Sequence, residues 1–263
     1  MTALLWAAAA LSLVWQPWPP ADIDIASKLQ PPSAANWLGT DGLGRDIASL
    51  LLVGAQASIA VGVVAVGMGL ILGVALGTLA AAQHHAGRVW VDTLLMRACD
   101  LTFAFPALLL AILLTAIHGP GLFNSVLAIG IFNIPVFARI TRSAALSVWV
   151  RDYVTAARTA GRGALGITRD HVLPNIAPAL VVQATISFAT AILAEAALSY
   201  LGLSVQPPQP SWGRMLNEAQ ALMFQAPLLA LYPGLAIMLS VLGLNLLGDG
   251  LRDLLDPRLS RQR

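Results

Sequence analysis

Charged residues are scarce in this sequence. Asp, Glu, Lys and Arg make up 11% of its 263 residues, and hydrophobic residues make up 57%. A soluble domain carries roughly a quarter charged residues. The composition therefore excludes an ordinary soluble protein and indicates an integral membrane protein whose surroundings are the lipid bilayer. We expect no nucleic acid partner.

Cysteine and lysine are almost absent. The single cysteine, Cys99, excludes an internal disulfide. The single lysine, Lys28, is followed by Leu29, whereas a Walker A phosphate loop needs a lysine followed by Ser or Thr. The chain is therefore predicted not to be an ATPase, and any ATP and magnesium must be bound by another subunit.

Clusters of metal-binding or catalytic side chains are also missing. His84 and His85 are adjacent, but neighbours on a helix point about 100° apart. No cysteine or carboxylate lies beside them at the spacing of metal ligands. We expect no metal site, no cofactor in this chain and no catalytic residues.

Long apolar segments fill the rest of the chain. A helix that crosses a bilayer needs about 20 apolar residues, within a range near 17–25. This predicts an all-α polytopic membrane protein with one domain over residues 1–263 and six transmembrane helices, at residues 3–17, 47–82, 93–117, 122–148, 176–201 and 228–247.

The first apolar segment is the shortest. It could be a cleaved signal sequence, but no Lys or Arg precedes it and Trp-Gln-Pro-Trp-Pro-Pro is a poor cleavage site. We favour an uncleaved helix and leave open whether it is trimmed.

Three local features predict how the helices pack. Gly69, Gly73 and Gly77 form a smooth stripe along one helix face, where another backbone can approach closely. Phe105-Pro106 predicts a kink. Arg97 and Asp100 are three residues apart, so we expect a local salt bridge.

Basic residues are distributed unevenly among the connecting loops. The loops at 18–46 and 203–227, with the turn at 118–121, hold three of the 15 Lys and Arg residues. Cytoplasmic loops carry the excess of positive charge. These loops are therefore predicted to be extracytoplasmic, and the loop at 149–175 cytoplasmic.

The loop at 149–175 is polar and unusually long, so it cannot lie in hydrocarbon. It holds Arg151, Arg158, Arg162 and Arg169. The sequence predicts a helix over 153–160, a break at Gly161 and Gly163 with a left-handed or otherwise strained backbone at Gly161, and a second helix over 164–171. Leu173-Pro174 is expected to end that second helix. We call the two helices and their break the knob, residues 149–175.

The knob resembles a known family. Thr155-Ala156-Ala157, Gly161 and His171-x-Leu173-Pro174 are similar to the EAA loop of ATP-binding cassette (ABC) importer permeases. Thr155 stands where that loop usually has Glu, and His171 stands where it usually has Ile. The histidine is common in the dipeptide, oligopeptide and nickel branch.

Three further motifs extend the resemblance over nearly the whole chain. They are LGTDGLGRD at 38–46, AEAALSYLGLSVQPPQPSWGRML at 194–216 and GDGLRDLLDPR at 248–258. The resemblance implies a type I ABC importer permease (MetI-like) fold and a multi-pass protein of the bacterial inner membrane. Its implied partners are a homologous second permease, two ATPase subunits and an extracytoplasmic solute-binding protein.

The resemblance also implies an importer of di- or oligopeptides, with nickel or a metal–chelator complex as the alternative. The residues expected to couple the ATPase to transport share the EAA pattern or lie beside it: Thr155, Ala156, Ala157, Arg158, Gly161, Arg162, Leu173 and Pro174. A self-sufficient channel or secondary transporter, and a non-transporting assembly subunit, stay open as other classes.

Two sites have competing interpretations. Glu195 is the one carboxylate deep in a predicted span, and such residues are functional candidates. It either meets a cationic group in the transport pathway or is a hydrogen-bonded packing residue. Asp41, Arg45 and Asp46, with two glycines, either fix a structural turn or contact the solute.

Overall fold

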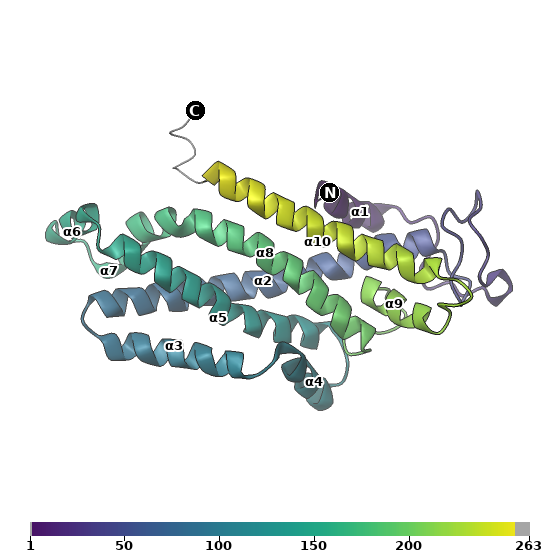
Figure 1. Cartoon of the computed structure of the whole chain (residues 1–263), viewed down its shortest axis with the longest axis horizontal. Coiled ribbons are helices and arrows are strands. Elements are labelled where there is room, and N and C mark those ends of the chain that lie inside the picture. Colours follow the sequence, from purple (N-terminus) through teal and green to yellow (C-terminus); the bar gives the residue numbers. More distant parts are fainter. Residues whose placement is uncertain (1, 256–263) are drawn as a thin grey trace. The chain divides into compact units, whose positions relative to one another are not determined.

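The structure is a computed structural model that describes residues 2–255, apart from the side chains of Leu4, Leu5 and Ala107. These residues form helices joined by loops, as Figure 1 shows, and the described part contains no strand. The α-helices are α1 (Thr2–Val14), α2 (Ile47–His85), α3 (Val89–Ala104), α4 (Ala107–His118), α5 (Leu122–Trp149), α6 (Asp152–Thr159), α7 (Ala164–Ile167), α8 (Leu173–Tyr200), α9 (Trp212–Gln220) and α10 (Leu228–Leu255). A 3₁₀ turn (Ile25–Ser27) and a π-helical turn (Thr168–Val172) complete them.

Four described helices are long and apolar enough to cross a membrane: α2, α5, the continuous helix Ala164–Tyr200 and α10. The count becomes five if α3 and α4 together form one interrupted span. The all-helical membrane fold is thus confirmed. Helix α1 has 13 residues, fewer than a span needs, so the count of six spans stays a prediction.

The described chain divides into two compact units. Unit 1 comprises Met1–Val64, Leu108–Ile129 and Phe188–Asn245. Unit 2 comprises Ala65–Ala107, Gly130–Ser187 and Leu246–Arg263. The predicted extracytoplasmic loops belong to unit 1 and the knob belongs to unit 2.

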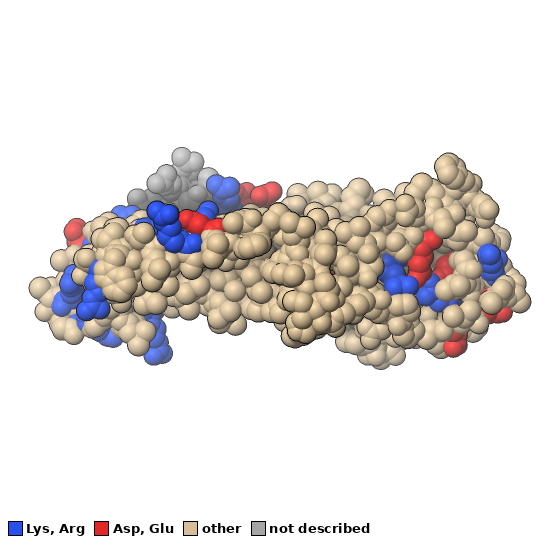
Figure 2. Space-filling view, turned by 90° about the horizontal axis from the view of Figure 1, so that it is seen from below, with Lys and Arg blue, Asp and Glu red and all other residues tan. Residues whose placement is uncertain are grey.

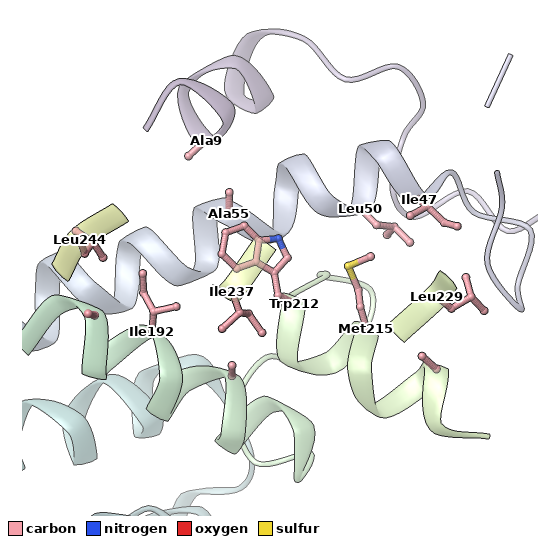
Figure 3. Close-up of a cluster of buried hydrophobic side chains, with 13 residues drawn as sticks. Ala9, Ile47, Leu50, Ala55, Ile192, Trp212, Met215, Leu229, Ile237 and Leu244 are labelled. Carbon is pink, nitrogen blue, oxygen red and sulfur yellow. The ribbon is translucent and has the colours of Figure 1, made fainter. Parts of the chain in front are cut away.

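The core of unit 1 is built around α9. Ser211 caps this helix, because its hydroxyl accepts a hydrogen bond from the Arg214 backbone N–H at 3.2 Å. Trp212, Met215 and Ala219 then fall on one face, spaced as an amphipathic helix requires, and all three are buried. They join Ile47, Leu50, Ala55, Ile192 and Leu229 in one hydrophobic cluster (Figure 3).

Trp212 attaches α9 to α2. Its indole N–H donates to the backbone carbonyl of Leu51 at 2.9 Å, which satisfies the polar end of a buried aromatic side chain. Burying a large apolar side chain stabilises a fold by roughly 1.5–3 kcal/mol. Helix α9 ends at Gln220.

In unit 2 the glycine stripe of α2 packs against α5. A Cβ atom added at Gly73 would lie 2.5 Å from Cβ of Phe137, and one added at Gly77 would lie 2.6 Å from Cβ of Thr141. The two backbones are therefore close enough to exclude side chains. The predicted role of the stripe in helix packing is confirmed.

Two local predictions at α3 need correction. The chain does not merely kink at Phe105-Pro106: α3 ends at Ala104 and α4 begins at Ala107. Asp100 pairs with Arg139 of α5 instead of Arg97. The guanidinium of Arg139 also lies 4.6 Å from the ring centroid of Phe103, so a cation–π contact accompanies the pair.

Pro174 does not end the second helix of the knob, contrary to the prediction. Helix α7, the π-helical turn and α8 form one helix, Ala164–Tyr200. The backbone N–H of Leu173 bonds to the carbonyl of Thr168, five residues earlier. This wider turn lies directly before Pro174 and accommodates the proline within the continuous helix.

Candidate functional site

The knob is a short helix, a tight turn and the beginning of a long helix. Helix α6 ends at Thr159, and Gly161 follows with a backbone φ of +85°. This left-handed conformation favours glycine, so the predicted strain at the break is confirmed. Gly163 has a φ of −72°, which any residue can adopt, so the backbone at this position does not require glycine.

The residues expected to couple an ATPase lie largely on the surface of the knob. Figure 2 shows basic side chains gathered over α6 and α7. Five of the six coupling residues in and after α6 are exposed, and Ala157 is half-buried; the exposed ones are Thr155, Ala156, Arg158, Gly161 and Arg162. Pro174 is exposed and Leu173 is half-buried.

Buried side chains fix the knob from within. Val154 of α6, Ile167 of α7 and Val172 are each at most 1% exposed. Arg162 and Asp170 form an exposed ion pair at 2.5 Å. By contrast Leu165 is 85% exposed, an apolar side chain beside the arginines that the sequence analysis did not single out.

His85, at the end of α2, contacts the knob and joins it to α2 within unit 2. Its ring stacks on Trp149 at 5.0 Å between centroids. Nη1 of Arg158 lies 3.1 Å from Nε2 of His85. Because a guanidinium can only donate, Nε2 of His85 is the acceptor. Sequence reasoning weighed His85 only as a metal ligand and missed this role.

Asp92 is the centre of a second polar group in unit 2. Its buried carboxylate accepts two hydrogen bonds from Arg142, at 2.5 and 2.6 Å, and contacts Nδ1 of His84 at 2.7 Å. Such a bidentate, charge-assisted pair is among the stronger side-chain contacts. It joins the beginning of α3 to α5.

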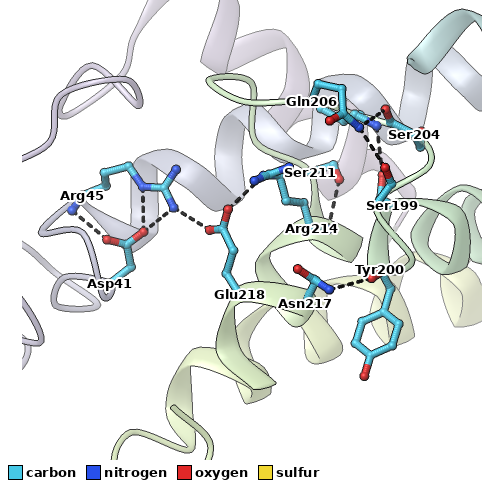
Figure 4. Close-up of polar contacts among 12 residues, drawn as sticks. Asp41, Arg45, Ser199, Tyr200, Ser204, Gln206, Ser211, Arg214, Asn217 and Glu218 are labelled. Carbon is cyan, nitrogen blue, oxygen red and sulfur yellow. Dashed lines mark hydrogen bonds and ion pairs between the residues drawn. The ribbon is translucent and has the colours of Figure 1, made fainter. Parts of the chain in front are cut away.

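In unit 1, Arg45 connects the LGTDGLGRD loop to α9 (Figure 4). Its guanidinium pairs with Asp41 at 2.5 Å and with Glu218 at 2.6 Å, and Glu218 also accepts from Arg214 at 2.8 Å. Burial alone would lower the pKa of Arg45, but the two carboxylates raise the pKa above its ordinary value. The guanidinium is therefore always charged here.

The loop prediction is partly correct. Asp41 and Arg45 pair as expected, and Gly44 has a φ of +79°. Asp46 instead accepts hydrogen bonds from Ser49 and Asn36. The contact with Glu218, 173 residues away, was not predicted.

Glu195 of α8 is fully buried within unit 1. The hydroxyl of Ser199, one helical turn later, donates to its Oε1 at 2.6 Å. The side chain exposes no surface to solvent, as the packing interpretation expects, but its Oε2 has no hydrogen-bond partner among the described residues.

Comparison with known proteins identifies the family. Residues 73–261 match the family model described as "Binding-protein-dependent transport system inner membrane component". The chain belongs to this family. It is thus a permease subunit of an ABC importer in the inner membrane, rather than an enzyme, as the motifs indicated.

The permease is similar to curated relatives over most of its length. It is 45% identical over 239 residues to the dipeptide transport system permease protein DppC of Alkalihalophilus pseudofirmus, covering 91% of this chain and 77% of the relative. It is 49% identical over 228 residues to the glutathione transport system permease protein GsiD of Escherichia coli, covering 87% and 74%. The predicted branch of the family is therefore confirmed.

A solved structure shows the same fold. The permease aligns with a chain of the inward-facing MetNI methionine ABC transporter at a TM-score of 0.67 and 19% identity. The alignment covers 79% of this chain and 96% of that one. At this identity the likeness concerns the fold alone, and it agrees with the expected MetI-like architecture.

Proposed function

We propose that this permease is one of two homologous membrane subunits of an importer for di- or oligopeptides. Two ATPase subunits and an extracytoplasmic solute-binding protein complete the assembly. The relatives named for dipeptide and glutathione transport support the substrate class. Nickel or a metal–chelator complex is the alternative substrate for the same type of transporter.

One observation carries the proposed coupling mechanism. The second half of the knob and α8 form one uninterrupted helix of 37 residues, Ala164–Tyr200. A force applied to the exposed face of α6 and α7 would therefore act directly on a helix that can cross the membrane. Alternating access follows if ATP-driven closure of the ATPases favours one of two arrangements of the helices.

Small side chains suit the docking face. Ala156 and Ala157 of α6 let a partner backbone approach closely, while Arg158 and Arg162 can pair with carboxylates of an acidic groove. Leu165, with 85% of its surface exposed, adds an apolar side chain to the surface of the knob. Leu173 and Pro174 then transmit the movement to α8.

The test compares two glycines of the knob. A Cβ atom at either Gly161 or Gly163 would meet no atom within 4 Å, but only Gly161 has a positive φ. Gly161→Ala therefore strains the backbone by about 1–2 kcal/mol, whereas Gly163→Ala does not. Steric effects are matched, and the comparison isolates the conformation of the break.

The complex should be reconstituted with its ATPases and binding protein, and ATPase association, ATP hydrolysis and peptide uptake measured separately. We expect Gly161→Ala, and more strongly Gly161→Val, to weaken association or to uncouple hydrolysis from uptake, and Gly163→Ala to behave as wild type. Wild-type coupling in Gly161→Val would overturn the coupling role of the knob. Uptake without ATPase subunits would instead indicate a self-sufficient channel or secondary transporter, and full uptake without this chain would indicate an assembly subunit.

Glu195 has a second proposed role, in the solute pathway. Because Glu195 is fully buried in unit 1, neighbouring residues must move before its carboxylate can meet a cationic solute. The role is tested by substitution in the Discussion.

A further inference from the structure

Unit 1 contains a cavity of about 350 Å³ that no motif predicted. Its lining comes from the loop before α2, the first turn of α2, α9 and the first turn of α10. The apolar residues of the lining include Leu50, Met215, Leu222 and Leu229. Its charged residues are Lys28, Asp41, Arg45 and Glu218.

The charges of the lining balance one another. Arg45 is neutralised by Asp41 and Glu218. Lys28 is exposed, and its ammonium has no ion pair or hydrogen bond to the residues that the structure describes. The lining therefore offers one available cation among the described residues. Glu218, whose carboxylate oxygens already accept from Arg45 and Arg214, keeps 31% of its side chain exposed and has lone pairs left for a further donor.

The volume limits the size of a ligand. One water occupies about 30 Å³ in the liquid, so the cavity corresponds to about a dozen heavy atoms. Pockets for small ligands begin near 300 Å³ and combine apolar walls with a few polar groups. A phospholipid with two acyl chains is several times too large, whereas a dipeptide has a suitable size.

We propose that this cavity is a binding site for a small zwitterionic peptide with an apolar side chain. The peptide carboxylate pairs with the Lys28 ammonium, the peptide ammonium faces Glu218, and the apolar side chain packs among Leu50, Leu222 and Leu229. The proposal rests on the proposed function, because the site would receive a transported peptide on the outer segment of the permease. The permease would then bind the peptide at a site of its own, in addition to the site on the solute-binding protein.

The Lys28 contact gives the site a measurable preference. An exposed ion pair contributes up to about 1 kcal/mol, which corresponds to about a fivefold change in affinity. The free acid of Ala-Leu should therefore bind two- to fivefold more tightly than Ala-Leu amide, which lacks the carboxylate. Lys28→Gln should abolish this preference, and the matched variant Lys28→Arg should keep it.

Binding should be measured on the assembled transporter in lipid nanodiscs, without the binding protein, by equilibrium dialysis of isotope-labelled Ala-Leu and Ala-Leu amide. Ala219→Leu provides an independent variant, because Ala219 lines the cavity and the larger side chain fills it. We expect Ala219→Leu to weaken binding of both probes. Lys28 is exposed, so its variants test the site without disturbing the core.

Three results would overturn the proposal: no saturable binding to wild type, an unchanged preference in Lys28→Gln, or unchanged binding in Ala219→Leu. Displacement of Ala-Leu by decanoate at equal or lower concentration would identify a fatty-acid site instead. ATP-driven uptake of Ala-Leu by the complete transporter is measured in parallel. Uptake without binding contradicts the cavity alone, whereas binding without any peptide uptake contradicts the proposed function.

Discussion

At the scale of single residues, unit 2 offers a direct comparison between two carboxylates of α3. Asp92 is 3% exposed in its side chain and contacts both Arg142 and His84, whereas Asp100 is 56% exposed and pairs with Arg139. The residue types are equal, but the environments differ. Burial and the number of partners should decide how much each pair contributes to stability.

Asp92→Asn should therefore destabilise the protein by about 1–3 kcal/mol, because it leaves a partly buried guanidinium without its counter-charge. Asp100→Asn should change the free energy of unfolding by less than about 1 kcal/mol, as exposed pairs do. Thermal unfolding of both variants in the same detergent checks the difference. Equal shifts in the unfolding midpoint would show that the buried pair contributes no more to stability than the exposed pair.

Glu195 is the second residue whose role depends on its surroundings. Glu195→Gln keeps the shape and the hydrogen bond to Ser199 but removes the negative charge. If the carboxylate faces the pathway during transport, uptake of cationic peptides should fall more than uptake of neutral ones. Uptake assays with a matched pair of peptides, one with Lys and one with Gln, measure this selectivity. Equal uptake of the two by the variant would favour the packing role.

At the scale of elements, the close approach of α2 and α5 depends on glycine. Gly73→Val would bring side-chain atoms into Phe137 and into the carbonyl of Ile134, 2.6 Å from the position of Cβ. Overpacking of this kind costs about 1–3 kcal/mol. We expect a lower unfolding midpoint and a lower yield of the purified protein.

Gly67, on the same helix, is the control. A Cβ atom there meets nothing within 4 Å, and alanine has a better helix propensity than glycine by about 1 kcal/mol. Gly67→Ala should be neutral or slightly stabilising in the same unfolding experiment. A similar loss in both variants would mean that the stripe is not a packing surface.

At the scale of the whole molecule, the predicted topology has the knob in the cytoplasm and the loops of unit 1 outside. Cysteines introduced at exposed sites test it: Trp37 and Phe224 for the outer loops and Leu165 for the knob, with exposed fractions of 60%, 101% and 85%. The native Cys99 is buried and is replaced by Ser in all variants. An impermeant thiol reagent should label positions 37 and 224 in whole cells and position 165 only after the membrane is opened. Labelling of position 165 in intact cells would reverse the orientation.

The sequence by itself determined the helical membrane class, the knob and the family. Hydrophobic runs reveal helices that can cross a bilayer because lipid leaves no other way to satisfy the backbone. The left-handed φ of Gly161 was also predictable, because a glycine between two helical patterns marks a left-handed turn. These properties depend on residues close together in the chain.

Only the tertiary structure decided which distant residues meet. Arg45 and Glu218 are separated by 173 residues, and Asp92 and Arg142 by 50, so no local pattern predicts their pairing. The same limit explains two wrong predictions. Asp100 pairs with Arg139 of another helix and not with Arg97 of its own, and a π-helical turn lets the helix continue through Pro174. The burial of Glu195 and the cavity beside Lys28 likewise arise from packing between separate elements, which composition and periodicity do not specify.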